Sequence, residues 1–467
     1  MNRNNFLIHL ALAIVLVLIA AFAGQLNRWR KDWKSHVPRV VPAAEKKRAT
    51  SAEDMALAES RLRGRPEVLV KFKPGVSQEA IDELTTRFND RVEDRIESDP
   101  GLEAIDDLDD LDANQTVAQY LAQPEVEYAE PNMEIELDAV ETALPPIHPS
   151  DPKFEDQWAL ANSGQRGGKQ GADISAMHAW LTTTGSDKVV VAVLDSGVDY
   201  THEDLAPNMW KRPASIDAYQ DDQLGTIDDE DGFNAIDNSS DPMDENGHGT
   251  HCAGIIGAEG GNNIGITGVN WKVRIMPLKF MNAGGFGTTK DAIEAINYVI
   301  DRKKAGVNVR VISASWGSTQ RSRALGEVIQ KAIDNDILFV AAAGNSSVNN
   351  DRQPHFPSSY PSVLAVAALD RHDQLAKFSN YGVKSVAIAA PGVDILSTWL
   401  GNAYEEKSGT SMATPVVSGV AALIVAENPR ISVDQLKKRL LASADPIVAL
   451  KGKVATGGRV NAAKALQ

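Results

Sequence analysis

Three short runs of mainly apolar residues constrain the fold of this chain more than any other feature of its sequence. They span residues 189–194 (VVVAVL), 307–312 (VNVRVI) and 337–343 (ILFVAAA). Their length and their β-branched side chains are typical of strands buried inside a sheet. Functional groups in open parallel sheets lie at the carboxyl ends of the strands, so the residues that follow each run are the first candidates for a site.

The first run ends directly at Asp195, which is therefore predicted to stand at the end of a buried strand. A second candidate, His248, lies between Gly247 and Gly249 and precedes the small apolar segment 252–257 (CAGIIG). That segment predicts a buried helix that begins near the histidine. The two glycines leave room beside the imidazole ring.

A serine in the segment 409–415 (GTSMATP) is the third candidate. It precedes a helix-like run at 415–428, so its hydroxyl is expected near the positive end of a helix. A serine hydroxyl is a weak nucleophile and needs a base, which in turn needs an acid to hold it. Ser411, His248 and Asp195 supply these groups. Each residue alone would more often be structural, but the three extended motifs together predict nucleophilic catalysis.

A nucleophilic attack on a carbonyl group places negative charge on its oxygen, which hydrogen-bond donors must stabilise. The third apolar run is followed by Gly344 and Asn345, so this asparagine is the candidate donor. The alternative is an ordinary turn residue.

The motifs and their order, Asp195, His248 and Ser411, resemble those of the subtilisin-like serine peptidases, the subtilases. The thermitase and proteinase K branches have the most similar motifs. The resemblance covers residues 151–467 and implies an α/β fold of three layers with a mainly parallel central sheet. It also implies endopeptidase activity through an acyl-enzyme on Ser411, with Asn345 as the side-chain donor of the oxyanion hole.

The same resemblance implies that segment 313–317, after the second run, pairs with the backbone of an extended peptide substrate. Gly317 allows that backbone to approach closely, and Trp316 shapes a pocket for an upstream side chain. His355 is expected at the floor of the primary specificity pocket, where it could favour polar or acidic side chains; a surface-loop histidine is the alternative. The predicted substrate-binding residues are Ser313, Ala314, Ser315, Trp316, Gly317 and His355.

Cys252 is the only cysteine, so the chain cannot form an intramolecular disulfide. It follows His248 by one helical turn, which places it under the site. It resembles the buried, mercury-sensitive cysteine of the thermitase and proteinase K branches. His251 is expected to be a structural neighbour of the site.

The formal net charge is −16, which argues against nucleic acid as a partner because no basic patch of useful size is present.

Carboxylates gather at 93–138 and at 217–245. Acidic, Gly/Asn-rich loops can wrap Ca²⁺, which takes about six to eight oxygen ligands. Spacings that resemble calcium loops of the family imply a structural Ca²⁺; a solvated acidic loop is the alternative. The implied ligands are Asp151, Asp204 and Asn262 for one site, and Asn234, Asp237 and Asp241 for another.

The first residues predict export. Residues 6–23 form an apolar run of 18 residues that ends in an Ala-Phe-Ala sequence typical of a cleavage site. Basic residues follow it directly, so an uncleaved anchor that tethers the protein to a membrane is the alternative to a cleaved signal peptide, and a cytoplasmic enzyme is a third. We expect a signal peptide or anchor at 1–24, a linker at 25–65, and a secreted or cell-envelope protein.

Residues 66–138 predict a small α+β domain, with strands at 68–72 and 126–132 and helices at 78–88 and 115–122. This block resembles the inhibitory propeptides of subtilases; an unrelated small domain is the alternative. The resemblance implies a zymogen whose own propeptide is an intramolecular inhibitor. The propeptide would be removed autocatalytically within a connector at 139–150, which leaves 151–467 as the catalytic domain.

Other functions stay open. A pseudo-protease could bind peptides without cutting them, although such decoys usually lack one of Asp195, His248, Asn345 and Ser411. A membrane-anchored processing protease would share the chemistry and differ in location. A lipase-like hydrolase is less consistent, because Ser411 is not in a Gly-x-Ser-x-Gly motif.

Overall fold

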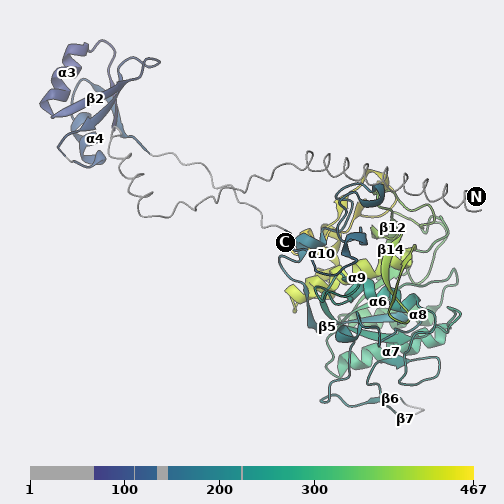
Figure 1. Ribbon diagram of the computed structural model, residues 1–467. Helices are drawn as coiled ribbons and strands as arrows, with labels where there is room; N and C mark the ends of the chain where they lie inside the picture. Colours follow the sequence, from purple (N-terminus) through teal and green to yellow (C-terminus); the bar gives the residue numbers. More distant parts are fainter. Residues whose placement is uncertain (1–67, 110, 134–145, 222–224) are drawn as a thin grey trace, which may run out of the picture. The chain divides into compact units, whose positions relative to one another are not determined.

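The computed structural model describes residues 68–109, 111–133, 146–221 and 225–467. They belong to two compact units, the first ending at Glu141 and the second beginning at Thr142 (Figure 1). The apolar run at 6–23, the predicted linker at 25–65 and most of the predicted connector at 139–150 lie outside the described residues.

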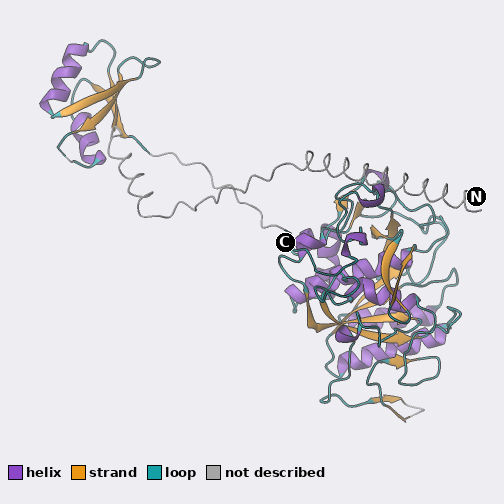
Figure 2. Ribbon diagram, in the orientation of Figure 1, coloured by secondary structure: helices purple, strands orange, loops and turns teal. Residues whose placement is uncertain are grey.

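The first unit contains an antiparallel sheet with strand order β2-β3-β1-β4 and two helices that pack against it (Figure 2). Val68, Val70 and Phe72 lie on one side of β1 and form a core with side chains from both helices. Ser77 and Asp112 cap the two helices by accepting hydrogen bonds from the first turn of each. The elements are β1 (Val68–Phe72), α3 (Gln78–Arg87), β2 (Asp90–Arg95), β3 (Leu102–Asp107), α4 (Ala113–Leu121) and β4 (Val126–Pro131).

The second unit is built on a nine-stranded sheet with the order β16-β17-β13-β12-β11-β10-β5-β9-β8. All neighbouring strands run parallel except β16 and β17, which confirms the expected mainly parallel sheet. The strands are β5 (Gly185–Asp195), β8 (Phe233–Asn234), β9 (Lys272–Lys279), β10 (Val309–Ala314), β11 (Leu338–Ala342), β12 (Leu364–Leu369), β13 (Ile388–Pro391), β16 (Asp445–Pro446) and β17 (Gly458–Arg459).

Helices cover both faces of this sheet. On β5, Val189, Val191 and Val193 pack in the core that contains α6 and α9, whereas the residues between them pack in a second core against α7 and α8. Strands buried on both faces are apolar at most positions, which explains the mainly apolar runs in the sequence. The helices are α6 (His248–Gly257), α7 (Thr289–Lys304), α8 (Arg323–Asp334), α9 (Thr410–Glu427) and α10 (Val433–Ala442).

Smaller elements complete the second unit. Two hairpins, β6 with β7 and β14 with β15, stand apart from the main sheet. Among the helices that the structure describes, one, α9, is long and apolar enough to cross a membrane, but 83% of that stretch is buried inside the protein. The remaining elements are α5 (Ala176–Ala179), β6 (Tyr219–Asp221), β7 (Gly225–Ile227), β14 (Ile395–Trp399), β15 (Ala403–Lys407) and α11 (Ala462–Ala465).

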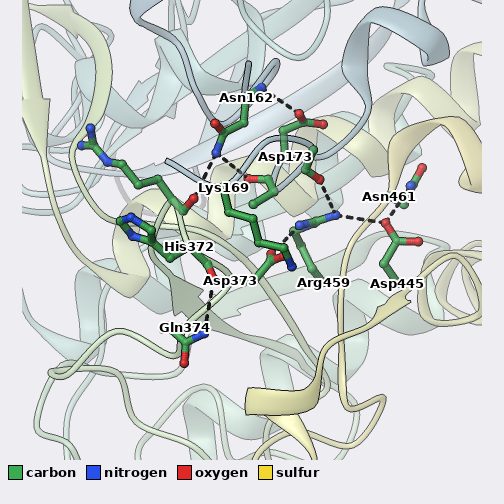
Figure 3. Close-up of polar contacts among 12 residues, drawn as sticks. Asn162, Lys169, Asp173, His372, Asp373, Gln374, Asp445, Arg459 and Asn461 are labelled. Atoms are coloured by element: carbon green, nitrogen blue, oxygen red, sulfur yellow. Dashed lines mark hydrogen bonds and ion pairs between the residues drawn. The ribbon is translucent and has the colours of Figure 1, made fainter. Parts of the chain in front are cut away.

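A buried polar network joins early and late segments of the second unit (Figure 3). Arg459, on β17, is 4% exposed; its guanidinium pairs with Asp373, with Asp445 at 3.1 Å, and with the carbonyl oxygen of Gly171 at 3.1 Å. Asn461 donates a further hydrogen bond to Asp445 at 2.8 Å. The network therefore holds the chain near residue 171 against β17, the last strand in the sequence.

Candidate active site

Asp195 and His248 meet where β5 ends and α6 begins. Asp195 is 1% exposed, and its Oδ1 accepts hydrogen bonds from His248 Nδ1 at 2.7 Å and from the Ser196 N–H at 2.8 Å. Burial of the imidazole disfavours its protonated form. The charge and hydrogen bond of Asp195, with a smaller contribution from the charge of Asp244, outweigh this effect of burial, so the pKa of His248 is raised. The ring is thus oriented with Nε2 free to act as a base.

Glycine at position 249 is required by the close approach of α6 to the end of β5. A Cβ atom on Gly249 would lie 2.0 Å from the carbonyl oxygen of Gly197 and 3.1 Å from the Cβ of Asp195. Gly197 itself has φ +102°, a conformation that residues with side chains rarely adopt. The two glycines therefore allow the histidine and the carboxylate to come within hydrogen-bonding distance.

Ser411 lies in the first turn of α9, beside this pair. Its carbonyl oxygen accepts hydrogen bonds from Ser315 Oγ at 2.8 Å and from Cys252 Sγ at 3.5 Å, and that sulfur lies within 4.8 Å of a carboxylate oxygen of Asp195 and a ring nitrogen of His248. In the described part of the chain, Ser411 Oγ donates to the carbonyl oxygen of Ser315 at 3.0 Å and not to His248. The absence of this bond does not argue against catalysis, because catalytic hydrogen bonds often form or tighten only with substrate bound.

Asn345 follows β11 and is held against the start of α9. Its Oδ1 accepts from both the N–H and the hydroxyl of Thr410, each at 2.9 Å. Its Nδ2 has no hydrogen-bond partner among the described residues and lies 3.5 Å from the position that a Cβ atom on Gly409 would take. The amide N–H₂ therefore remains available beside the main chain of Ser411, where a donor to an oxyanion is needed.

The segment after β10 is packed against the chain at His355. A Cβ atom on Gly317 would lie 2.1 Å from His355 Cε1, and Ser318 and Phe356 exchange two main-chain hydrogen bonds of 2.7 Å. Burial lowers the pKa of His355, so the ring is neutral at neutral pH. His355 is half-buried against Gly317 and Gly344, and not on a free surface loop.

The other residues of the predicted binding segment have different surroundings. Trp316 is partly exposed; its Nε1 donates to the carbonyl oxygen of Leu194 at 2.9 Å and its ring lies 4.8 Å from that of Phe280. Ser313 and Ala314 are buried inside the sheet, and the Ser313 hydroxyl bonds with that of Ser418 in α9 at 2.9 Å. The Ser313 side chain thus contacts α9, whereas that of Ala314 packs in the second core with α7 and α8.

Cys252 and His251 are buried on α6. Burial raises the pKa of the Cys252 thiol well above its usual value, so the thiol stays protonated and is a poor nucleophile. Burial also lowers the pKa of His251 to about 4, and its Nε2 lies 2.9 Å from the carbonyl oxygen of Glu405. Both residues are neutral supports of the site.

The residues of the first implied calcium site lie together. Asn262 donates to Asp204 at 2.9 Å, and the Gly261 N–H donates to Asp151 Oδ2 at 2.7 Å. Both carboxylates are buried, and burial raises the pKa of each, with a further contribution at Asp204 from the charge of Asp151. The buried Asp151 Oδ1 has no hydrogen-bond partner in the described structure. Buried carboxylates with an unpartnered oxygen fit a divalent cation.

The residues of the second implied site are less closely joined. Asn234 donates to Asp237 at 3.2 Å, but Asp241 accepts from Tyr200 at 3.1 Å and from the Met243 N–H at 3.0 Å. Asp237 and Asp241 are both exposed. This set fits a cation less well than the first.

Two residues that shape the site were not singled out from the sequence. Thr410 orients Asn345, and Asp244 accepts hydrogen bonds from the start of α6. A carboxylate just ahead of a helix start is a capping signal, and the spacing Asp244 to Gly247 could have revealed it. Thr410 has no such signal, because its role depends on a contact with a residue distant in sequence.

Comparisons with known proteins identify the family of this chain. Residues 186–463 match the Subtilase family, and residues 65–132 match the Fervidolysin N-terminal prodomain. A thermophilic serine proteinase from Bacillus sp. (strain AK1) is 35% identical over 406 residues, 86% of this chain and 87% of that protein. Thermitase from Thermoactinomyces vulgaris is 35% identical over 319 residues, 68% of this chain and 99% of that protein. A solved structure of proteases from Pseudoalteromonas arctica PAMC 21717 is similar with a TM-score of 0.56 and 28% identity, over 68% of this chain and 98% of that one. The chain therefore belongs to the subtilase family of serine endopeptidases and carries a fervidolysin-like N-terminal prodomain.

Proposed function

We propose that this serine endopeptidase works through Ser411, His248, Asp195 and Asn345, and that it is exported as a zymogen. The observation that carries the proposal is the 2.7 Å hydrogen bond between Asp195 and His248, formed beside the first turn of α9. The apolar run at 6–23 supports export to a secreted or cell-envelope location.

In the first step, His248 Nε2 accepts the proton of Ser411 as its oxygen attacks the scissile carbonyl carbon. Asp195 keeps the other ring nitrogen as a donor and stabilises the imidazolium that forms. The imidazolium then protonates the leaving amine. Water, activated by His248 in the same way, hydrolyses the acyl-enzyme.

The negative charge on the tetrahedral intermediate would be stabilised by Asn345 Nδ2 and by the main-chain N–H of Ser411. Thr410 holds the Asn345 oxygen with two hydrogen bonds, so the Nδ2 direction is fixed before substrate binds. Fixed donors need no reorganisation during the reaction, and loss of such a donor costs roughly 10²- to 10³-fold in turnover.

His355 supports a preference for polar side chains in the primary specificity pocket. Its ring packs against Gly317 and Gly344, next to Asn345. Because burial lowers its pKa, the ring would offer a neutral hydrogen-bonding group and no positive charge to an acidic side chain. Polar uncharged side chains are therefore preferred in this proposal.

Asp151, Asp204 and Asn262 would hold a structural Ca²⁺. The ion would compensate two buried carboxylates whose pKa values are raised by burial, and would supply a partner to Asp151 Oδ1. It would stabilise the fold and take no part in the reaction.

The prodomain would inhibit the enzyme until Ser411 cuts the chain within 139–150. Full-length Ser411→Ala tests this assignment together with catalysis. The variant should remain an uncut precursor and lose casein hydrolysis by roughly 10⁶-fold. Normal maturation of the variant would show that a second protease removes the prodomain, and casein hydrolysis at the wild-type rate would contradict the role of Ser411.

A further inference from the structure

Asp244 makes an unusual set of contacts at the start of α6. Its carboxylate is 5% exposed. Oδ1 accepts hydrogen bonds from the N–H groups of Asn246 at 2.9 Å and Gly247 at 3.0 Å, and Oδ2 accepts from the N–H of Thr250 at 3.0 Å and its hydroxyl at 2.6 Å. A single buried side chain thus binds the main chain on both sides of His248.

The helix needs this external cap because its own N-cap residue has no side chain. Gly247 has φ +96°, and a Cβ atom there would lie 2.5 Å from the ring of Trp399. A serine or aspartate at that position, which would normally cap Thr250, does not fit. Asp244 takes over this role from three residues upstream.

The position of Asp244 also has an electrostatic consequence. The N-terminus of a helix carries partial positive charge, which disfavours a protonated histidine in the first turn. A buried carboxylate that accepts the hydrogen bonds of that turn offsets this charge. Asp244 therefore favours the imidazolium that forms each time His248 accepts a proton.

Among the described residues, the titratable groups that face His248 come from three places. Asp195 approaches from β5, Asp244 from the loop before α6, and Cys252 and His251 lie on α6 itself. The thiol is held protonated and His251 is held neutral by burial. The charges acting on His248 from these groups are therefore those of Asp195 and Asp244.

We propose that Asp244 is a positioning residue for the peptidase reaction: it fixes the first turn of α6 so that His248 meets Asp195, and its charge supports protonation of His248. Asp195 holds the ring, while Asp244 holds the main chain that carries it. The proposal rests on the assignment of His248 as the general base.

The test is the pH profile of kcat/KM for Asp244→Asn, with the full chain expressed and matured and with active sites counted by a fluorophosphonate. The acid limb of this profile reports the pKa of the free base. Loss of a charge at a helix terminus should move that limb to lower pH by roughly half a unit. A fall in kcat should accompany the shift, because the imidazolium is less stabilised.

Asp173→Asn is the matched control. Asp173 is also buried, at 9% exposure, and accepts main-chain hydrogen bonds from Asn162 and Ser175 at 2.7 Å each, but it belongs to the network at β17 (Figure 3). The acid limb of the kcat/KM profile of Asp173→Asn should match that of the wild type.

Asp244→Glu, which keeps the charge, should have the wild-type acid limb even if kcat stays low. Asp244→Ser, a smaller neutral side chain, replaces Asp244→Asn if the latter does not fold.

An unshifted acid limb in the neutral variants would overturn the proposal, as would an equal shift in Asp173→Asn. Failure of the wild-type protein to react with the fluorophosphonate would instead contradict the proposed catalytic roles. The two failures are therefore distinguishable.

Discussion

Two buried carboxylates, Asp229 in the peptidase domain and Asp90 in the prodomain, have opposite surroundings: Asp229 lies against arginines, whereas Asp90 lies against another carboxylate. Asp229 is fully buried and pairs with Arg302 at 3.3 Å and Arg212 at 3.0 Å. In the prodomain, Asp90 and Asp107 stand opposite each other on β2 and β3, and each is 8% exposed. The first arrangement compensates the buried charge, and the second does not.

Asp90 shows the consequence most clearly. The hydroxyl of Tyr120 donates to its Oδ2 at 2.6 Å, while its buried Oδ1 has no hydrogen-bond partner within the described residues. Burial, which outweighs the hydrogen bond from Tyr120, raises the pKa of Asp90 to about 6, and the charges of Asp107 and Asp109 add to the effect. The prodomain therefore folds around a carboxyl group whose ionisation is disfavoured by its surroundings.

This preference gives the prodomain a pH dependence with a defined sign. The folded-state pKa of Asp90 is above its ordinary value of 3.8, so the protonated group stabilises the fold. The contribution is complete below about pH 4 and is lost as the pH rises through about 6. The prodomain is therefore expected to lose stability as the pH rises through about 6.

The largest expected effect comes from breaking a compensated charge in the peptidase domain. Arg459→Met removes the partner of Asp373 and Asp445 (Figure 3). Among the described residues, the buried Asp373 would keep only its pair with the exposed Lys169, at 2.9 Å, so the loss of Arg459 should lower the free energy of unfolding by about 3–5 kcal/mol. The measurement is thermal unfolding of the full chain in the Ser411→Ala background, which prevents self-digestion.

Lys464→Met provides the control for that experiment. Lys464 also pairs with Asp445, at 2.6 Å, but its side chain is 54% exposed. Exposed pairs contribute about 0–1 kcal/mol, so the control should unfold close to the parent. An equal effect of the two variants would show that burial of the charge does not matter here.

Calcium removal is expected to have the next largest effect, and only on the peptidase domain. A ligand present at about 100 times its Kd stabilises the folded state by about 2.7 kcal/mol. Excess chelator should therefore lower the unfolding temperature of the peptidase domain and leave that of the prodomain unchanged. An unchanged peptidase transition would contradict a Ca²⁺ at Asp151 and Asp204.

The smallest expected effect is a gain of stability in the prodomain. Asp90→Asn removes the uncompensated charge and should stabilise the prodomain at pH 7.5 by about 1 kcal/mol, or roughly 4–8 °C in its unfolding temperature. At pH 4 the effect should vanish, because Asp90 is then protonated. Asp106→Asn is the control, since Asp106 is partly exposed and pairs with Arg91 at 3.0 Å. A stabilisation independent of pH would contradict the account of Asp90.

The strands of the two domains were predicted to different extents, because a strand is recognised from the apolar residues at its buried positions. Strands of the peptidase domain are buried on both faces, so β5, β10 and β11 appear as apolar runs. In the prodomain, β2 and β3 were not predicted. Their positions beneath the helices include Asp90, Glu103 and Asp107 in place of apolar residues, which hides the alternation that identifies a strand.

The same limit applies to the candidate site. Asp195, His248, Asn345 and Ser411 stand in local motifs, so their identity could be inferred from nearby residues. The role of Thr410 could not, because it depends on hydrogen bonds to Asn345, which is distant in the sequence. Contacts between distant segments are set by the fold and leave no local pattern.

The most direct test of the central claim is mass spectrometry of the matured protein after reaction with a fluorophosphonate. The account predicts one covalent label, on Ser411, with loss of casein hydrolysis in proportion to labelling. Ser411→Ala, carried through the same reaction as the precursor, should take up no label. Peptide hydrolysis that persists in fully labelled protein, or a label on another residue, would contradict the account.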